Sequence, residues 1–415
     1  MPDGQPSEQL TSRQWGIVWL IAAVQFINIL DFVMVMPLGP DFAASLGISE
    51  SQLGNVGGAY TAAACVSGLV GSLFLDRFDR RKALAVAMLG LVIGTAAGGF
   101  AFDLPTLLFA RVLAGAFGGP ATSLSFSIIA DTIPANLRGR AMGTVMGAFS
   151  IASILGVPVG LWLAEAFSWR APFLGVAAAG LIVCGCAIFL LPPMTSHLER
   201  TGKKVSFAQL ISDPLVQLSY LMTAVVMFAG FVLIPNIAAY LQLNLGFPRH
   251  ALKYAYGAGG VASLFATQLG GRLVDRFGSF RVGTFGALLV MLVVFLFFYL
   301  PHPHVATWLV LVAFVGFMLA NGLRNVSYNT LTTKVPAPEV RARFTSIQSA
   351  VQHGASALSA MLSAQLLSVV GEGPERHLDG MPVVSTVSIA LSALVPVMLF
   401  VVERGVKRRN ALKAS

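Results

Sequence analysis

The feature that most constrains this chain is a succession of long apolar segments that recur along its whole length. A helix needs about 20 apolar residues to cross the hydrocarbon core of a bilayer. Only 11% of the 415 residues are charged, whereas soluble domains contain about a quarter. A soluble fold also needs a polar coat. This composition therefore excludes an ordinary soluble enzyme, a nucleic-acid-binding protein and a disordered chain, and it predicts an all-α membrane protein.

The apolar segments predict twelve membrane-spanning helices, because they are continuous runs and not the short alternating strands of a barrel. The predicted spans are residues 15–38, 52–75, 83–102, 104–129, 141–164, 171–191, 215–241, 254–271, 282–300, 305–331, 344–370 and 382–402. A polar interruption divides them into six and six. We therefore expect an N-terminal six-helix bundle (1–191), a cytoplasmic linker (192–214) and a C-terminal six-helix bundle (215–415).

The distribution of Lys and Arg predicts the orientation of these spans, since basic residues accumulate in short cytoplasmic loops. With both termini inside, 21 of the 27 basic residues fall in cytoplasmic segments, and Arg111 and Arg324 lie within spans. The outer segments contain only Arg170, Arg249, Lys253 and Arg376. The polar start of the chain resembles no cleavable signal. We expect a multi-pass protein of a bacterial inner membrane with both termini in the cytoplasm.

Two loops recur at nearly the same separation. Residues 72–82 align with 271–281, and residues 133–141 align with 335–344, at offsets of 199 and 202 positions. Both matches fall in the same predicted inner loop of each half. Because each half has six spans, the copies have the same orientation, so the sequence predicts a duplication with parallel repeats.

The first of these loops resembles the signature of the major facilitator superfamily, Gly-x-x-x-Asp-Arg-x-Gly-Arg-Arg. Here it reads Ser72-Leu-Phe-Leu-Asp76-Arg77-Phe-Asp79-Arg80-Arg81, so serine and aspartate replace the two glycines. Aspartate tolerates left-handed backbone better than most residues, so we expect the turn to be kept. The second copy has both glycines, Gly271 and Gly278, but not the paired arginines. The resemblance covers essentially the whole chain and implies the fold of that family.

Other segments are similar to particular branches of this superfamily. LLFARVLAGAFGG resembles its Arg-x-x-Gln-Gly element, with Arg111 and Gly115 matching. LGVPVG contains Gly156, Pro158 and Gly160 and resembles the glycine-proline motif of antiporters, with a different spacing. These small residues are also expected to allow close helix packing. With FINILDFVMVMPLGP and WRAPF, the chain looks most like bacterial drug and sugar-efflux carriers, which implies proton-coupled export.

One carboxylate lies well inside a predicted span. Asp31 is about 10 Å from the outer end of its span, and Arg111 lies at a similar depth on a helix that starts from the same face. Intramembrane carboxylates cost several kcal/mol unless they are paired or neutralised, and they face the bundle interior. We expect Asp31 to carry the coupled proton and Arg111 to modulate it. A static buried pair, or a single acid whose hydrogen bonds are satisfied, is the alternative.

Further polar and aromatic side chains are expected to line a water-accessible path between the halves. Residues at intervals of three or four share one broad face of a helix. An interhelical hydrogen-bonding role is the alternative for the polar ones, and packing is the alternative for the aromatic ones. The candidates are Gln25, Asn28, Phe32, Tyr240, Asn321, Arg324, Tyr328, Gln348, Gln352 and His353.

The duplicated loops are the expected cytoplasmic gates. The resemblance places Asp76 against the positive N-terminal end of span 344–370, and Asp275 in a similar position against span 141–164. Ion pairs would come from Arg77, Arg80, Arg81 and Arg276. The alternative is that these residues only set the topology.

No phosphate-binding loop, HExxH or GxSxG motif is present, and the three cysteines lie in apolar stretches. We therefore expect no enzyme activity, cofactor or metal. The predicted function is proton antiport that exports small organic, amphipathic compounds. A sugar or metabolite permease, facilitative or symporting, is the alternative, and a non-transporting receptor or a channel is the rival from another class. The expected partners are a small-molecule substrate, protons and the lipid bilayer, with no nucleic acid, and the carrier is expected to be a monomer.

Overall fold

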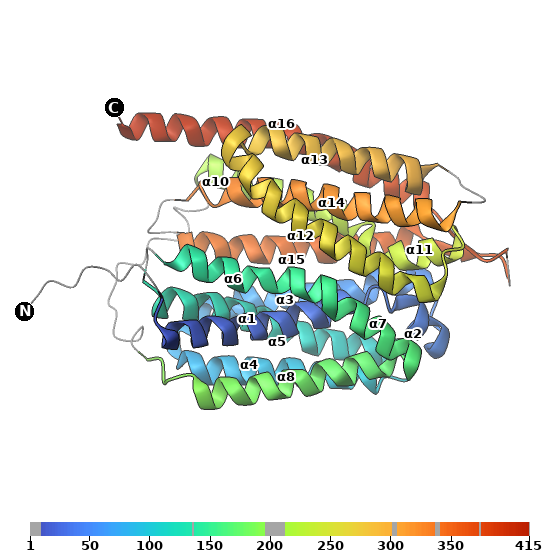
Figure 1. Cartoon of the computed structure of the whole chain (residues 1–415), viewed down its shortest axis with the longest axis horizontal. Coiled ribbons are helices and arrows are strands. Elements are labelled where there is room, and N and C mark those ends of the chain that lie inside the picture. Colours follow the sequence, from blue (N-terminus) through green and yellow to red (C-terminus); the bar gives the residue numbers. More distant parts are fainter. Residues whose placement is uncertain are drawn as a thin grey trace, which may run out of the picture.

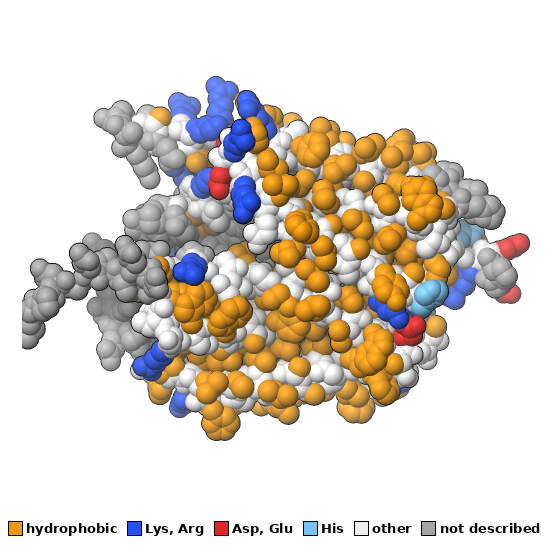
Figure 2. Space-filling view, in the orientation of Figure 1, with side chains coloured by type: hydrophobic (Ala, Val, Ile, Leu, Met, Phe, Trp, Pro, Cys, Tyr) orange, Lys and Arg blue, Asp and Glu red, His pale blue; other side chains and the backbone are white. Residues whose placement is uncertain are grey.

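The computed structural model describes residues 10–134, 137–195, 212–300, 305–336, 341–372 and 375–414. Long helices lie side by side along the long axis of the molecule (Figure 1). Helix α1 begins and helix α16 ends at the same end, which we call the terminal end; the opposite end is the distal end. Hydrophobic side chains cover the middle of the visible face, while Lys and Arg gather toward its ends (Figure 2). This is the surface of an all-α membrane protein.

The first bundle consists of the helices before residue 191. They are α1 (Ser12–Met34), α2 (Gly39–Leu46), α3 (Leu53–Phe74), α4 (Arg80–Gly99), α5 (Leu104–Thr132), α6 (Arg138–Ile151), α7 (Val157–Ala166) and α8 (Arg170–Leu190). Short 3-10 helices lie at Glu50–Gln52 and Leu75–Arg77, and a π-helical turn joins α6 to α7 at Ala152–Gly156. Helix α5 contacts α1, α3 and α4, so it lies at the centre of this bundle.

The second bundle consists of the elements after residue 213. They are α10 (Pro214–Phe231), α11 (Ile237–Leu243), α12 (Leu252–Phe277), α13 (Ser279–Val294), α14 (Thr307–Thr332), α15 (Arg341–Leu366) and α16 (Met381–Ala414), with strands β1 (Ser368–Val370) and β2 (His377–Asp379). Short 3-10 helices lie at Ile234–Asn236 and Arg249–Ala251, and a π-helical turn at Phe295–Tyr299 ends α13. The strands pair antiparallel, with Val369 opposite Leu378.

As continuous helices, three predicted spans are shorter at their ends than expected. The span at 15–38 was extended too far, because α1 ends at Met34 and the chain turns into α2. Span 215–241 is broken at Phe231, and Pro235, which lacks a backbone N–H, lies in the following 3-10 helix. The end of span 344–370 is a strand and not a helix.

Proline also reshapes the span predicted at 141–164. Pro158 cannot donate a backbone hydrogen bond to the preceding turn. The five residues Ala152–Gly156 form a π-helical turn there, after which α7 continues. At the end of the chain, α16 runs on to Ala414, well beyond the predicted end at residue 402.

Ten of the described helices are both long enough and apolar enough to cross a membrane. The predicted spans that fall outside this group correspond to α12 and α15, each of 26 residues. These two helices join the bundles: α15 packs along α3, and α12 packs against α6, α7 and the π-helical turn between them. Because one face of each is covered by the other bundle, they need less apolar surface than helices that face lipid.

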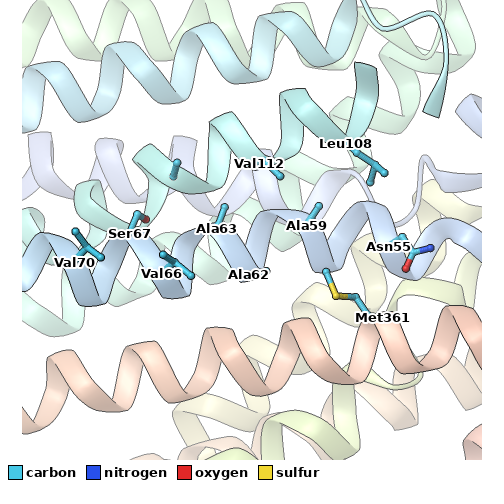
Figure 3. Close-up of a pocket in the computed structure, with 11 residues that line it drawn as sticks. Asn55, Ala59, Ala62, Ala63, Val66, Ser67, Val70, Leu108, Val112 and Met361 are labelled. Carbon is cyan, nitrogen blue, oxygen red and sulfur yellow. The ribbon is translucent and has the colours of Figure 1, made fainter. Parts of the chain in front are cut away.

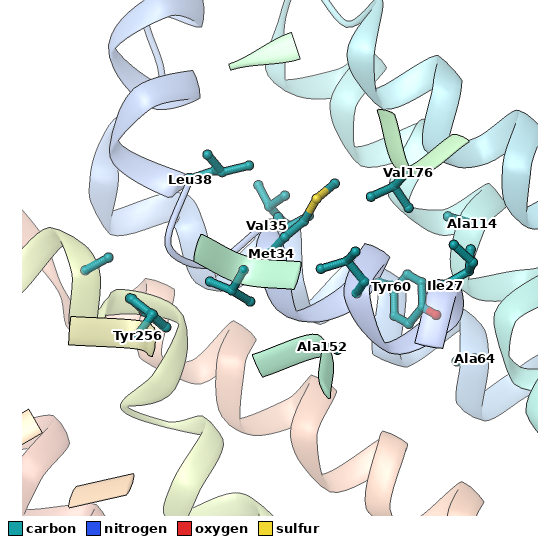
Figure 4. Close-up of a cluster of buried hydrophobic side chains, with 14 of the residues drawn as sticks. Ile27, Met34, Val35, Leu38, Tyr60, Ala64, Ala114, Ala152, Val176 and Tyr256 are labelled. Carbon is teal, nitrogen blue, oxygen red and sulfur yellow. The ribbon is translucent and has the colours of Figure 1, made fainter. Parts of the chain in front are cut away.

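The two bundles share one apolar core. Its described residues include Ile27 and Met34 from α1, Tyr60 from α3 and Tyr256 from α12 (Figure 4). Glycines allow the closest helix contacts. A Cβ atom added at Gly115 would lie 2.1 Å from the carbonyl oxygen of Tyr60, so no larger residue fits there.

The other predicted packing residues also lie at helix contacts. A Cβ added at Gly156 would lie 2.6 Å from Leu30 Cδ1, whereas one added at Gly160 would meet its nearest atom only at 3.8 Å. Pro158 contacts the second bundle: its Cγ would lie 3.5 Å from a Cβ added at Gly257 on α12. The proline therefore lies at the junction of the bundles.

Candidate functional site

Asp31 and Arg111 form a buried ion pair inside the first bundle. Asp31 on α1 is fully buried and Arg111 on α5 is 1% exposed. The two terminal guanidinium nitrogens donate to the two carboxylate oxygens at 3.0 and 3.1 Å. Arg111 also donates to the backbone carbonyl of Asp31 at 3.3 Å. This bidentate geometry is the strongest form of such a pair, so the predicted proximity of the two residues is present.

Two further residues, neither of which was a candidate from the sequence, hold this pair in place. Thr95 on α4 donates from Oγ1 to Asp31 Oδ1 at 2.8 Å. The ring of Tyr60 on α3 lies under the Arg111 guanidinium, with 4.7 Å from Cζ to the ring centroid. Threonine and tyrosine are ordinary residues in membrane helices, and only the relative rotation of the helices brings these two to the charges.

A hydrogen-bonded polar group continues from the ion pair toward the terminal end. Asn28 donates from Nδ2 to the carbonyl of Gly118 at 2.9 Å and to Thr122 Oγ1 at 2.7 Å. Tyr60 Oη donates to Asn28 Oδ1 at 2.6 Å, and Thr122 Oγ1 donates to Gln25 Oε1 at 3.4 Å. The predicted candidates Gln25 and Asn28 are therefore brought together, in a group that links α1, α3 and α5.

A row of aromatic rings leads from the ion pair to the second bundle. The ring of Tyr60 stacks on Phe32 of α1, with 5.2 Å between centroids. Phe32 stacks in turn on Phe231 of α10 at 5.8 Å. The charged pair in one bundle is thus connected, through two ring contacts, to the junction with the other bundle.

Three ion pairs join the bundles at the distal end, and each has its acid in the first bundle and its base in the second. Arg249 donates from Nε to Asp41 Oδ1 at 2.7 Å, and a second bond joins the same two side chains. The other two pairs each measure 2.6 Å and are Lys253–Glu165 and Arg376–Glu50. Glu50 is almost completely buried, at 3% exposed. The distal ends of the bundles are therefore held together by complementary charge.

The second bundle contains a buried arginine with no carboxylate partner among the described residues. Arg324 on α14 is 1% exposed. Its guanidinium donates to Asn321 Oδ1 at 2.7 Å, and to the Val226 carbonyl and Ser392 Oγ at 3.4 Å each. Its Nε has no hydrogen-bond partner. The charge is therefore solvated by neutral groups alone, and the predicted neighbours Asn321 and Arg324 do lie together.

Two polar residues of α15 bond to α14, the helix that carries this arginine. Gln352 donates to Tyr328 Oη at 3.0 Å, and Tyr328 is one turn from Arg324 on α14. Gln348 donates to Thr332 Oγ1 at 2.9 Å. The hydrogen bonds of His353 within the described residues are local: Nδ1 lies 2.9 Å from the carbonyl oxygen of Ser349 and 3.5 Å from its Oγ.

Tyr240 does not join this group. It lies on α11 near the distal end, where Oη donates to the carbonyl of Phe297 at 2.9 Å. Its ring packs against Phe298, with 5.3 Å between centroids. These contacts tie α11 to the end of α13, so Tyr240 has a packing role within the second bundle.

The predicted gate residues occupy the terminal end, and only part of that prediction can be described. The side chain of Asp76 lies outside the described residues. Arg77, Asp275 and Arg276 are exposed. Arg80 is buried and forms an ion pair with Asp131 at 3.4 Å. The last gate residue, Arg81, donates to the carbonyl of Leu191 at 3.3 Å.

The expectation that Asp79 keeps a glycine-like, left-handed turn is wrong. Its φ of −55° and ψ of 124° are ordinary, and its side chain caps α4 by accepting from the Lys82 backbone N–H at 3.1 Å. The second carboxylate oxygen accepts from the Met194 N–H at 3.0 Å. Partial burial acts to raise the pKa of Asp79, but these N–H groups, with Arg81, outweigh it and lower the pKa. Aspartate therefore replaces glycine by serving as a helix cap.

A groove of about 740 Å³ lies away from the buried charges, between α3 and α5 with Met361 of α15 at one end (Figure 3). Small and apolar residues line it, among them Ala59, Ala63 and Val112. Val66 and Val70 at its rim are 62% and 50% exposed. The groove is therefore open at Val66 and Val70, and it lies where α15 of the second bundle meets the first bundle.

Two helical bundles, a shared junction and ionisable groups buried at membrane depth define a polytopic membrane carrier. The model of the Major Facilitator Superfamily matches residues 21–360. The chain therefore belongs to the major facilitator superfamily, which is a family of transporters and not of enzymes. It follows that the protein is a multi-pass transporter whose partners are a small-molecule substrate and the lipid bilayer.

Solved structures share this fold at low sequence identity. The crystal structure of a bacterial homologue of the human lysosomal transporter Spinster, inward-facing and unoccupied, is similar with 17% identity, a TM-score of 0.74 and coverage of 96% of this chain and 99% of that one. The D-xylose-proton symporter matches with 19% identity, a TM-score of 0.74 and coverage of 94% and 97%. The xylose transporter XylE from E. coli, partially occluded and inward open, has 16% identity, a TM-score of 0.71 and coverage of 94% and 98%. At these identities the likeness concerns the fold alone.

Proposed function

We propose that this transporter exports small amphipathic compounds by proton antiport, with Asp31 as the coupling carboxylate and Arg111 as its modulator. The observation that carries the proposal is the bidentate Asp31–Arg111 pair, fully buried and braced by Thr95. It contains the one carboxylate that the sequence places deep in a span. Intramembrane carboxylates of this kind typically mark proton pathways.

The pair can act as a switch because protonation removes its attraction. A neutral Asp31 no longer holds the guanidinium, so Arg111 is freed from one of its two main contacts. A coupling ion must bind the two conformations of a carrier with different affinity. In our proposal, the pair is closed and deprotonated in one conformation, and it is separated and protonated in the other.

The aromatic row supplies a path from this switch to the bundle junction. Arg111 lies over Tyr60, whose ring stacks on Phe32, which stacks on Phe231 of the other bundle. A displaced guanidinium would loosen the first of these contacts. The distal ion pairs would then have to separate before the carrier could open at that end.

The orientation follows from charge. We propose that the terminal end is cytoplasmic and the distal end faces outward, because the basic residues concentrate near the chain termini and the inner loops. The described conformation, joined at the distal end, is then closed to the outside. We further propose a monomer in a bacterial inner membrane, organised as bundles 1–191 and 215–415 with the linker 192–214, and gated by the loops of Asp76 and Asp275.

A sugar or metabolite permease is the second candidate. One solved structure of the same fold is a D-xylose-proton symporter, and the cluster of Gln25, Asn28 and Thr122 offers hydrogen-bonding groups that would suit a hydroxylated substrate. The direction of proton movement separates the two candidates.

The test uses proteoliposomes that contain a pH-sensitive dye, with candidate compounds added outside. Antiport exchanges entering compound for leaving protons, so the lumen should become more alkaline. Symport carries protons inward with the compound, so the lumen should become more acidic. A panel of amphipathic compounds and sugars that produced only acidification would contradict the antiport proposal.

A further inference from the structure

The membrane interior of this carrier carries an excess of positive charge. Among all the charged residues of the sequence, those placed deep within spans are Asp31, Arg111 and Arg324. One negative and two positive charges leave a net charge of +1. Asp31 is fully engaged by Arg111 and Thr95, so the uncompensated charge belongs to Arg324.

Arg324 lies between α10, α14 and α16, beside the end of α10 where the next residue contacts the other bundle. A Cβ atom added at Gly230 of α10 would lie 3.4 Å from its terminal nitrogen NH2, so the guanidinium lies directly beside this glycine. The next residue, Phe231, reaches across the junction to Phe32. The hydrogen-bond partners of Arg324 are all neutral, and Nε has none. A planar guanidinium with unused donors matches an oxyanion in geometry.

We infer that the transported compound carries an acidic group, of which a carboxylate is the simplest, and that Arg324 is its counter-ion. This inference rests on the proposed transport function and specifies its substrate class. Among the described residues deep within the spans, the carboxylate is Asp31, and its bidentate pair with Arg111 leaves it unavailable to a cationic compound. An unpaired buried cation is costly, and a bound anion relieves that cost. An inside-negative membrane potential also drives anions outward, which favours export.

The probe is dansyl-aminoundecanoate, compared with its uncharged amide and with the amine of matching chain length. Binding to the purified full-length carrier is followed by energy transfer from its five tryptophans. We expect the carboxylate to bind about tenfold more tightly than the amide, and the amine to bind more weakly than either. Tightest binding of the amine would overturn the inference.

Substitutions at Arg324 test whether this residue causes the preference for the carboxylate. Arg324→Gln should bind the carboxylate and the amide equally, while Arg324→Lys, which keeps the charge, should retain a preference for the carboxylate. Arg404→Gln, which removes an exposed cation of α16 at the terminal end, is the matched control and should keep the full tenfold difference. A preference that persists in Arg324→Gln would contradict the assignment.

A second pair of variants avoids removing the arginine. Gly230→Asp places a carboxylate beside the guanidinium, at a site where an added Cβ makes only ordinary contacts. It should abolish the preference, because Arg324 is then paired internally. Gly230→Asn has nearly the same shape without the charge and should keep the preference. Identical behaviour of the two variants would overturn the inference even if Arg324→Gln did not fold.

The test of the substrate class can fail independently of the test of proton antiport. Binding selectivity is measured without a proton gradient, and proton movement is measured in vesicles. Asp31→Asn should leave the carboxylate preference in place while abolishing proton movement. A wild-type protein that moves protons but binds the amide and the carboxylate equally would remove the substrate class and leave the antiport proposal standing.

Discussion

The two bundles differ in whether a buried arginine has a carboxylate partner. In the first bundle, Arg111 is neutralised within the fold by Asp31. In the second bundle, Arg324 lies deep in α14 and is surrounded by neutral hydrogen-bond acceptors. Counted from the distal start of each helix, Arg111 is seven residues in and Arg324 is seventeen. The two buried arginines therefore lie at different depths, and one has a carboxylate partner within the fold while the other has only neutral partners among the described residues.

The duplicated loops differ in a similar way. In the first copy, Asp79 caps α4 with its own side chain. In the second copy, Gly278 has a φ of 88°, and the N-terminus of α13 is instead capped from a distance by Glu403 of α16, which accepts from the Phe280 N–H at 2.7 Å. A Cβ at Gly278 would lie 3.0 Å from that carboxylate. The glycine therefore serves the same purpose as the aspartate, since it admits an outside cap.

The largest expected effect comes from removing one partner of the first-bundle pair. Arg111→Ala leaves Asp31 buried without a counter-charge, which should lower the free energy of unfolding by about 3–5 kcal/mol. Thermal unfolding of the purified protein measures it. Arg324→Gln should cost less than about 1 kcal/mol, because no carboxylate is left unpaired. Equal losses of unfolding free energy in the two variants would contradict the proposed difference between the bundles.

The distal ion pairs should control the conformational equilibrium. Arg376→Glu places a second carboxylate against Glu50, which should shift the population toward the conformation open at the distal end by about tenfold. Labelling of a cysteine introduced beside Phe32 reports that opening. The exchanged double variant, Glu50→Arg with Arg376→Glu, restores opposite charges and should return labelling to the wild-type level. Labelling that is unaffected by the charge reversal would contradict a gating role.

A smaller effect is expected from the cap of α4. Asp79→Ala should cost about 1 kcal/mol, the usual value for a helix N-cap. Because the pKa of Asp79 is lowered in the folded protein, its contribution is complete above the pKa of the unfolded state, near 4. It is lost as the pH falls through the lower folded-state pKa. The difference in melting temperature between wild type and variant should therefore shrink below about pH 4, and a constant difference would refute the cap.

An effect no larger than that of the cap is expected at the first aromatic contact. Tyr60→Phe keeps the ring beneath Arg111 but removes the hydrogen bond from Oη to Asn28. A single neutral hydrogen bond contributes about 1 kcal/mol. Tyr60→Leu removes the ring as well and should slow coupled transport further. Equal transport rates in the two variants would argue against a role for the aromatic row.

The membrane fold and the Asp31–Arg111 pair could be predicted from the sequence. The long apolar segments require the first, and the cost of a buried charge requires the second. A charge at membrane depth demands a partner, and the chain offers few. The breaks in the helices were harder to predict. Pro158 and Pro235 lie within continuous apolar runs, and hydropathy does not register the missing N–H groups that reshape those helices.

The residues that complete the site could not be selected from the sequence. Thr95 and Tyr60 contact the ion pair because α4 and α3 are rotated so that these side chains face it. No local sequence pattern predicts that rotation. The distal ion pairs, by contrast, could have been suspected from the distribution of basic residues in the sequence. Arg249, Lys253 and Arg376 were three of the four basic residues on the predicted outer side, and each has an acidic partner in the other bundle. Exceptions to a topological charge rule therefore indicated contacts between the bundles.

The most direct test of the account is substrate-induced proton movement by Asp31→Asn in dye-loaded proteoliposomes. Wild type should make the lumen more alkaline when a transported compound is added outside. The variant should bind the compound, keep the carboxylate preference set by Arg324, and produce no change in luminal pH. Thr95→Val, which removes the hydroxyl that contacts Asp31 and the Leu91 carbonyl, is the control and should retain proton movement at a reduced rate. Normal proton movement by a folded Asp31→Asn protein would show that the coupling carboxylate has been wrongly assigned.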